Sequence, residues 1–329
     1  MADTADITFS GCDTPTAPLG VGTWAWGDRA TWGMGGYDAS LSEASIEAAW
    51  DASIADGVTL FDTAEVYGGG ESERIIGRLL AADPARRDSL VIATKFMPSP
   101  WKLDVNRALR ASLTASIERL GVHHVDLYQI HGPISLRSHA ALAEALAAAH
   151  GDGLALGVGV SNYSIKEMRS IQRELAKRDV PQASNQIEFS LLRRSPETSG
   201  LLAACAELGV VPLAYSPIGQ GRLTGKYSAA SPPPGKRNFS DHPMEQVDAI
   251  VAELRRIGAT NDGRTPSQVA LRWIIQKGAV PIPGAKNAEQ ARQNAGALGW
   301  SLSIEDMASL DRVALSGHQT FANRFWQHG

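Results

Sequence analysis

Four ionisable side chains of types that serve in proton transfer follow short apolar runs of this sequence. They are Asp62, Tyr67, Lys95 and His131. A free phenol has a pKa of about 10, too high for a good proton donor at neutral pH, but a neighbouring ammonium stabilises the phenolate and lowers that pKa. If the aspartate holds the lysine and the histidine orients a carbonyl oxygen, the tyrosine can protonate that oxygen. The four residues therefore predict acid catalysis on a carbonyl group.

Taken singly, these residues also have structural interpretations. Asp62 can cap a turn, Lys95 can end in solvent, and His131 can be a core histidine with hydrogen-bonded ring nitrogens. Together they are hard to explain by packing, because burying several ionisable groups is costly unless the groups pair. The spacing after successive apolar runs therefore favours the catalytic interpretation.

Reduction of a carbonyl also needs a hydride, which no side chain donates, so a redox cofactor is predicted. The glycines at 157 and 159 lie inside a predicted strand, and no Gly-x-Gly-x-x-Gly motif joins a first strand to a helix. A Rossmann site is therefore not indicated. Groups that can hydrogen-bond to a nicotinamide or stack on it follow later strands instead: Ser161, Asn162, Gln186 and Tyr215.

A phosphate-binding region is predicted after the seventh strand. Residues 219–243 are too long for an ordinary strand-to-helix loop and too rich in glycine and proline for a helix, which favours a functional loop. Residues of its first part could fold over a pyrophosphate: Gly219, Gly221, Leu223, Gly225 and Lys226. Lys286, which follows the eighth strand and precedes a helix, could meet a ribose phosphate.

The elements that must position these residues alternate regularly along the chain. Short β-rich runs are followed eight times by longer stretches with apolar residues at three- and four-residue spacing. The predicted strands lie near 19–24, 58–61, 90–94, 125–130, 155–160, 183–187, 210–215 and 279–282. The predicted helices lie near 42–56, 71–82, 104–120, 138–150, 165–178, 196–208, 266–277 and 287–297.

This alternation predicts the fold. Strands that are apolar on both faces, each followed by a helix, imply a parallel sheet, and eight such units imply a closed α/β barrel of the (β/α)8, or TIM, type. An open doubly wound sheet is the alternative. Residues 5–19 are predicted to form two short strands that plug one end of the barrel. Although about 150 residues per domain would allow two domains, no linker composition marks a boundary, and residues 1–329 are expected to form one.

Composition excludes several classes of protein. Hydrophobic residues make up 43% and charged residues 20% of the chain, as in soluble globular proteins. The formal charge of −4 provides no basic field for a nucleic acid backbone. The two cysteines, Cys12 and Cys205, form no metal-binding or disulfide pattern. A cytoplasmic location without a membrane span is expected, because no leader-like segment precedes Asp6 and no apolar run reaches the length of about 18 residues that a span needs.

The chain resembles the aldo-keto reductases from Leu19 to about Asp311. The motifs that carry the resemblance are GVGTW (20–24), FDTAEVYG (61–68), ATKF (93–96), VDLYQIHGP (125–133), GVSNYS (159–164), NQIEFSLL (185–192), LAYSPIGQGRLTGKY (213–227) and PIPGAKN (281–287). The eight motifs in this order indicate the family far more specifically than any single motif does.

The resemblance implies that Asp62, Tyr67, Lys95 and His131 are the catalytic residues, with the tyrosine as general acid. It also implies NADPH, extended across the barrel mouth without a Rossmann fold. NADH is the alternative cofactor, because the family's arginine on the last barrel helix aligns with Gln290 here. The implied cofactor-binding residues are Gly22, Thr23, Trp24, Asp62, Ser161, Asn162, Gln186, Tyr215, Ser216, Pro217, Gly219, Gly221, Leu223, Lys226, Gly284, Lys286, Gln290 and Asn294.

Aromatic residues near the strand ends predict an apolar substrate pocket. Those after the first and third strands and in the tail are Trp24, Trp26, Trp32, Trp101, Phe321, Phe325 and Trp326. Ordinary packing explains Trp32 and the tail residues equally well. Predicted substrate contacts are Trp24, Tyr67, Trp101 and His131. An aromatic or medium-sized aldehyde or ketone is favoured over a phosphorylated sugar.

Two other functions compete with carbonyl reduction. One is a binding or sensor protein on the same scaffold that turns over slowly or not at all, against which the complete catalytic set argues. The other is a Schiff-base lyase built on Lys95, which needs a neutral lysine where Asp62 favours a charged one. The number of subunits and the physiological substrate are left open.

Overall fold

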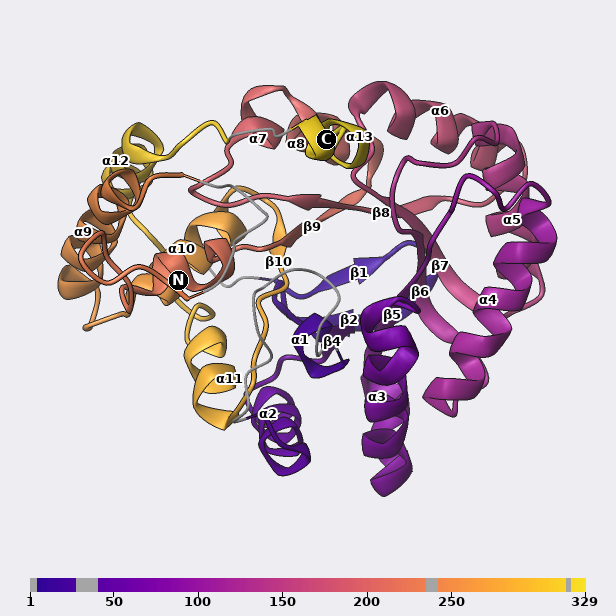
Figure 1. Ribbon diagram of the computed structural model, residues 1–329, viewed down its shortest axis with the longest axis horizontal. Coiled ribbons are helices and arrows are strands. Elements are labelled where there is room, and N and C mark those ends of the chain that lie inside the picture. Colours follow the sequence, from indigo (N-terminus) through magenta and orange to yellow (C-terminus); the bar gives the residue numbers. More distant parts are fainter. Residues whose placement is uncertain (1–4, 28–40, 235–241, 318–320) are drawn as a thin grey trace.

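The computed structural model describes residues 5–27, 41–234, 242–317 and 321–329, and within them the chain forms a barrel (Figure 1). The parallel strands among these residues are β3 Gly20–Gly22, β4 Leu60–Asp62, β5 Val91–Phe96, β6 Val125–Ile130, β7 Ala155–Ser161, β8 Gln182–Glu188, β9 Val211–Tyr215 and β10 Val280–Pro281. Each pairs with the next in sequence order. A parallel bridge between Gly22 and Gly284 joins the last strand region to the first. The predicted closed barrel is therefore confirmed, and the open doubly wound alternative is wrong.

The helices that cover the barrel follow the predicted alternation. They are α2 Glu43–Ala55, α3 Glu71–Ala82, α4 Val105–Leu120, α5 His139–Gly151, α6 Ile165–Ala176, α7 Ser195–Thr198, α8 Leu201–Leu208, α10 Pro266–Gln276 and α11 Ala288–Ala295. Ser42 and Ser164 cap α2 and α6 with reciprocal hydrogen bonds to the first turn. The single helix predicted over 196–208 is wrong, because Gly200 adopts a left-handed φ of +85° and separates α7 from α8.

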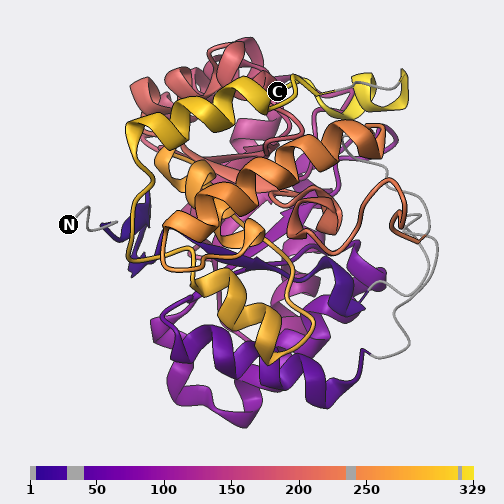
Figure 2. The ribbon, with the colours of Figure 1, turned by 90° about the vertical axis from the view of Figure 1, so that its left-hand side faces the viewer.

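Further short or added elements lie outside the eight repeats. They are α1 Trp24–Gly27, the 3-10 helices η1 Tyr67–Gly70, η2 Pro84–Ser89 and η3 Gly219–Thr224, and the helices α9 Met244–Thr260, α12 Ile304–Val313 and α13 Phe321–Trp326. Part of the segment predicted as a long loop, 219–243, is thus the 3-10 helix η3, while residues 235–241 lie outside the described residues. Figure 2 shows α9, α10 and α12 packed side by side on one flank of the barrel.

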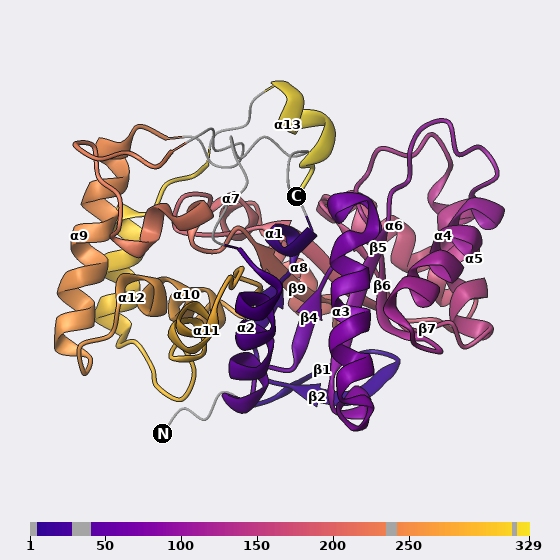
Figure 3. The same ribbon diagram turned by 60° about the horizontal axis from the view of Figure 1, so that its bottom comes forward.

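The amino-terminal hairpin closes the barrel at the end away from α13 (Figure 3). Its strands, β1 Ile7–Phe9 and β2 Cys12–Thr16, pair antiparallel. Phe9 and Cys12 are buried in one apolar cluster with barrel-interior residues such as Leu127. The tight turn needs Gly11, whose φ is +89° and whose missing Cβ would lie 2.3 Å from the Leu156 carbonyl oxygen. The predicted plug is therefore confirmed, and it leaves the opposite end of the barrel for the polar residues.

No helix among the described residues combines the length and the apolar composition that crossing a bilayer requires.

Candidate active site

One cavity of about 700 Å³ opens where the carboxyl ends of the strands meet. Asp62, at the end of β4, Tyr67, at the start of η1, and His131, directly after β6, all line it. Lys95 differs from the sequence prediction, because it lies inside β5 and its side chain is 0% exposed. Its ammonium therefore lies beneath the cavity, behind the other three groups.

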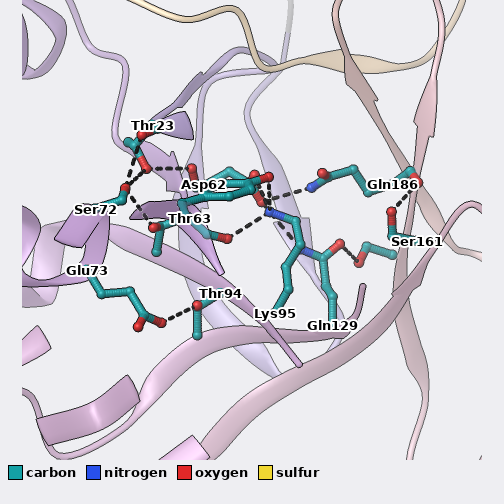
Figure 4. Close-up of polar contacts among 12 residues, drawn as sticks. Thr23, Asp62, Thr63, Ser72, Glu73, Thr94, Lys95, Gln129, Ser161 and Gln186 are labelled. Carbon is teal, nitrogen blue, oxygen red and sulfur yellow. Dashed lines mark hydrogen bonds and ion pairs between the residues drawn. The ribbon is translucent and has the colours of Figure 1, made fainter. Parts of the chain in front are cut away.

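The Lys95 ammonium links two of the other catalytic candidates, Asp62 and Tyr67, by hydrogen bonds. Figure 4 shows its contacts with Asp62 and Thr63. Its Nζ donates to Asp62 Oδ1 at 2.5 Å and to the Thr63 carbonyl oxygen at 2.7 Å. A third contact, at 3.4 Å, reaches the Tyr67 hydroxyl. Three acceptors around one nitrogen suit a charged ammonium with three N–H donors.

Asp62 is oriented by donors from further strands. Its second carboxylate oxygen, Oδ2, accepts from Gln186 Nε2 at 2.8 Å and from Gln129 Nε2 at 3.4 Å. Gln129 is itself held by the Ser184 hydroxyl, which donates to its Oε1 at 3.1 Å. The buried carboxylate thus has partners on both oxygens, as a buried charge requires.

A set of hydroxyl groups supports this pair from the side of β3 and α3 (Figure 4). Thr23 Oγ1 donates to the Asp62 carbonyl oxygen at 3.0 Å and shares a 2.7 Å hydrogen bond with Ser72 Oγ. Thr63 Oγ1 donates to the same Ser72 oxygen at 2.9 Å. Thr23, predicted as a cofactor ligand, therefore lies outside the cavity lining and acts on the backbone of Asp62.

The electrostatics of Tyr67 correct the sequence prediction. Desolvation raises the pKa of the Tyr67 phenol well above its usual value, and the Asp62 charge raises it further. The expected lowering of this pKa by Lys95 does not prevail, because burial of the phenol and the Asp62 charge both act in the opposite direction. Tyr67 is therefore a protonated phenol at neutral pH, which is the form a proton donor needs.

His131 lies beside the phenol at the base of the cavity. Its ring centroid is 5.7 Å from that of Tyr67, in an edge-to-face arrangement. Burial lowers the pKa of His131 well below its usual value, and the Lys95 charge adds to this effect. The imidazole is therefore neutral at neutral pH and can serve as a hydrogen-bonding group for a substrate oxygen.

This shift predicts a pH dependence of stability. Because the folded state lowers the pKa of His131 below the unfolded value of about 6.5, protons bind the unfolded chain preferentially below that pH. The contribution of neutral His131 to the free energy of unfolding is therefore fully present above a pH of about 6.5 and is lost as the pH falls. Between pH 7 and 5, the free energy of unfolding should fall by up to about 1.4 kcal/mol per pH unit more in the wild type than in His131→Asn. Urea titrations at both pH values measure this slope, and equal slopes would contradict the prediction.

Most residues predicted to bind a cofactor line the same cavity. They are Gly22, Trp24, Asp62, Ser161, Asn162, Gln186, Tyr215, Ser216, Pro217, Gly221, Lys226, Gly284, Lys286, Gln290 and Asn294. Gly219 and Leu223 do not line it. Leu223 is fully buried in the apolar core instead. Because this segment was predicted as a loop, inward and outward faces could not be assigned to η3.

The groups predicted to hold a carboxamide already bond to one another. Ser161 Oγ donates to the Gln186 carbonyl oxygen at 2.9 Å, and the Tyr215 hydroxyl donates to Asn162 Oδ1 at 2.9 Å. The Gln186 side-chain amide donates to Asp62. Gln186 therefore connects the predicted cofactor site to the Asp62 carboxylate, a link that the sequence alone does not indicate.

Only some of the aromatic residues predicted to form a substrate pocket line the cavity. Trp24 lines the cavity, whereas Trp26 is buried and donates its indole N–H to the Ala285 carbonyl oxygen at 2.7 Å. Trp101 is 78% exposed and lies outside the lining, so the structure does not place it with the other predicted substrate contacts. Trp32 and the side chain of Phe321 lie outside the described residues.

Several lining residues were not predicted. They are Ala25, Ile218, Gln220, Thr224, Tyr227, Ser267, Ile282, Pro283 and Gln293. Trp326, one of the tail aromatics for which a pocket and ordinary packing were both open, also lines the cavity. Gln293 lies three residues after Gln290 on α11, so helical spacing could have found it. Trp326 reaches the cavity from the carboxyl-terminal tail, where its ring centroid lies 5.4 Å from that of His131. No local pattern indicates this long-range contact.

Comparisons with known proteins show the family to which the chain is related. A model of the aldo/keto reductase family matches residues 18–315. The chain is 35% identical to the chloroplastic pyridoxal reductase of Arabidopsis thaliana, over 94% of this chain and 87% of that protein. Its structure is similar to the glycerol dehydrogenase of Gluconobacter oxydans, with a TM-score of 0.81 and 29% identity over 98% of this chain and 99% of that one. An aldo/keto reductase from Klebsiella pneumoniae, solved with NADP and acetate, has a TM-score of 0.73 and 27% identity over 97% and 98% of the two chains.

Proposed function

Because the chain belongs to the aldo/keto reductase family, we propose that it reduces aldehydes or ketones to alcohols with NADPH and that Tyr67 is the general acid. The observation that carries the proposal is the buried chain from Asp62 through Lys95 to the Tyr67 hydroxyl, which ends at the cavity. Residues 1–329 would act as one catalytic domain.

The residues around the cavity fit a nicotinamide dinucleotide. At one end, Tyr215 offers a ring and Ser161, Asn162 and Gln186 offer amide and hydroxyl groups. At the other, Lys226 and Lys286 offer positive charge for phosphates. When bound, the cofactor would supply the hydride that no side chain can donate. The Klebsiella relative solved with NADP supports this choice.

Each catalytic side chain then has a distinct task. Tyr67 holds a proton at neutral pH and donates it to the carbonyl oxygen of the substrate, while neutral His131 orients that oxygen. Lys95 stabilises the phenolate as it forms, and Asp62 keeps the ammonium in place. A Schiff-base lyase is not supported, because Lys95 Nζ is buried behind the cavity with all three donors engaged.

The proposal is tested by following the loss of NADPH absorbance with a panel of carbonyl compounds. The panel should include pyridoxal, in view of the Arabidopsis relative, together with benzaldehydes, aliphatic ketones and glyceraldehyde. Turnover with aromatic aldehydes is expected, because Trp24, Tyr67 and Trp326 line the cavity. Tight cofactor binding without turnover of any compound would instead favour a sensor protein.

Cofactor preference is predicted to depend on Lys286. Lys286→Ala removes a cation that can meet the ribose phosphate of NADPH, so KM for NADPH should rise about tenfold. KM for NADH, which lacks that phosphate, should change less than about twofold. Steady-state kinetics with both cofactors measure this difference. Lys166→Ala, at an exposed position on α6 outside the cavity lining, is the matched control.

Equal kcat/KM values of the wild type for NADPH and NADH would overturn the preference itself. Equal losses with both cofactors in Lys286→Ala would place Lys286 at a part of the dinucleotide that the two share.

A further inference from the structure

The last residues of the chain return to the active site and bury a polar side chain there. Gln327 directly follows α13 and is 1% exposed. A buried primary amide is tolerated only where it is hydrogen-bonded, so the partners of Gln327 are informative.

The Gln327 amide contacts the predicted nicotinamide end of the cavity. Its Nε2 donates to the Tyr215 hydroxyl at 2.9 Å and to the Glu188 carboxylate. The Tyr215 hydroxyl in turn donates to Asn162 Oδ1 at 2.9 Å. The next residue, His328, donates its backbone N–H to the Asn162 carbonyl oxygen at 3.0 Å. Tyr215 and Asn162 line the cavity, whereas Gln327 does not.

The tail is fixed to the barrel independently of these contacts. Arg193 Nη2 donates to the Gly329 carbonyl oxygen at 2.5 Å, and His328 Nδ1 lies 2.8 Å from a Glu167 carboxylate oxygen at the start of α6. The Glu188 partner of Gln327 is itself paired, because its Oε2 lies 3.9 Å from Arg193 Nε and both side chains are buried. The Gln327 amide is therefore held at its place before any ligand binds.

The backbone around the two cavity residues benefits from such support. Asn162 has a φ of +63°, and Ser216, which follows Tyr215, has a φ of +50°. Non-glycine residues hold left-handed conformations at a cost and keep them where surrounding contacts over-determine them. The tail supplies contacts to the Asn162 backbone and side chain and to the Tyr215 hydroxyl.

We propose that Gln327 is a positioning residue for the cofactor: its amide fixes the Tyr215 ring and, through the Tyr215 hydroxyl, the Asn162 amide at the nicotinamide end of the cavity. This inference rests on the proposed function, because it assumes that Tyr215 and Asn162 contact a nicotinamide. Trp326, the preceding residue, contacts His131 instead, so cofactor and substrate effects of the tail can be separated.

The test substitutes Gln327→Glu, which keeps the shape of the side chain but replaces the donor amide with a carboxylate facing Glu188. The Kd for NADPH, measured by quenching of tryptophan fluorescence without substrate, should rise about tenfold, because hydrogen bonds in a coupled network are lost. KM for NADPH should rise by a similar factor, while kcat stays within about threefold. Arg324→Ala, at an exposed position of the same tail helix, should leave both values unchanged.

A double variant that exchanges Glu188 and Gln327 distinguishes a positioning role of Gln327 from a contribution to the stability of the tail. In Glu188→Gln/Gln327→Glu an amide again faces a carboxylate, so Kd should return to within about threefold of the wild-type value. As an independent variant, Tyr215→Phe keeps the ring but removes the link, and adding Gln327→Glu to it should weaken binding no further.

If wild-type protein binds NADPH and Gln327→Glu binds it equally well, the inference is overturned while the proposed function stands. The inference is also overturned if Glu188→Gln/Gln327→Glu does not restore NADPH binding, or if the losses of affinity in Tyr215→Phe and Gln327→Glu add in full in the double variant. Either result would indicate only a structural role for Gln327. Failure of the wild type to bind NADPH would instead overturn the proposed function.

Discussion

Tyr67→Phe is expected to lower kcat for carbonyl reduction by about a thousandfold or more, within the range that general acid catalysis contributes. The substitution removes the hydroxyl that Lys95 Nζ contacts at 3.4 Å and leaves the ring in the cavity. Because the ring and the predicted cofactor groups are retained, Kd for NADPH should change less than about threefold. Single-turnover rates and fluorescence titration measure the two quantities separately.

A matched control removes the same atom from another buried tyrosine. Tyr128 on β6 is buried, and its hydroxyl has no hydrogen-bond partner among the described residues. Tyr128→Phe should therefore leave kcat within about twofold of wild type, because no buried hydrogen bond is lost. Retained turnover in Tyr67→Phe, with normal turnover in the control, would remove Tyr67 from the role of acid.

The raised pKa of Tyr67 makes release of its proton more difficult. A phenol that is desolvated and close to the Asp62 charge releases its proton reluctantly. In the proposed mechanism, proton donation therefore depends on the Lys95 ammonium, whose positive charge contacts the Tyr67 hydroxyl. In the proposed mechanism, Lys95 stabilises the developing phenolate rather than lowering the pKa of Tyr67 before the reaction.

The barrel and the clustering of the four candidate residues were predictable from the sequence, because both depend on the order of strands along the chain. Strands of a parallel barrel bring their carboxyl ends to one face, so residues such as Asp62 and His131 had to converge whatever the details of packing. The same reasoning located Ser161 and Gln186. It ended the third strand at residue 94, two residues too early, because β5 continues to Phe96 and includes Lys95; strand ends are poorly marked by composition.

The parts that could not be predicted depend on tertiary contacts or on added elements. Trp326 and Gln327 reach the site from the opposite end of the sequence, and no spacing relates them to His131 or Tyr215. The helix α9 carries apolar residues at helical spacing, including Val247, Ile250 and Leu254. Its pattern was available but fell outside the eight repeats that organised the prediction.

Lys95→Met is expected to abolish detectable reduction and also to lower the free energy of unfolding by about 3–5 kcal/mol, because it leaves an uncompensated buried carboxylate. Asp62 is 1% exposed and loses its 2.5 Å partner. The activity loss and the stability loss have different origins. The first reflects the missing charge beside the Tyr67 hydroxyl, and the second reflects the unpaired charge on Asp62.

A double variant distinguishes these origins. In Asp62→Asn/Lys95→Met the buried charge is removed, and the amide oxygen introduced at position 62 can still accept from Gln186, whose Nε2 lies 2.8 Å from Asp62 Oδ2 in the wild type. Most of the stability should therefore return in urea titrations, although the Thr63 carbonyl oxygen stays without its lysine donor. Reduction should stay absent, because no ammonium remains to stabilise the Tyr67 phenolate. If the double variant regained activity together with stability, Lys95 would serve only to neutralise Asp62 and would have no part in proton transfer.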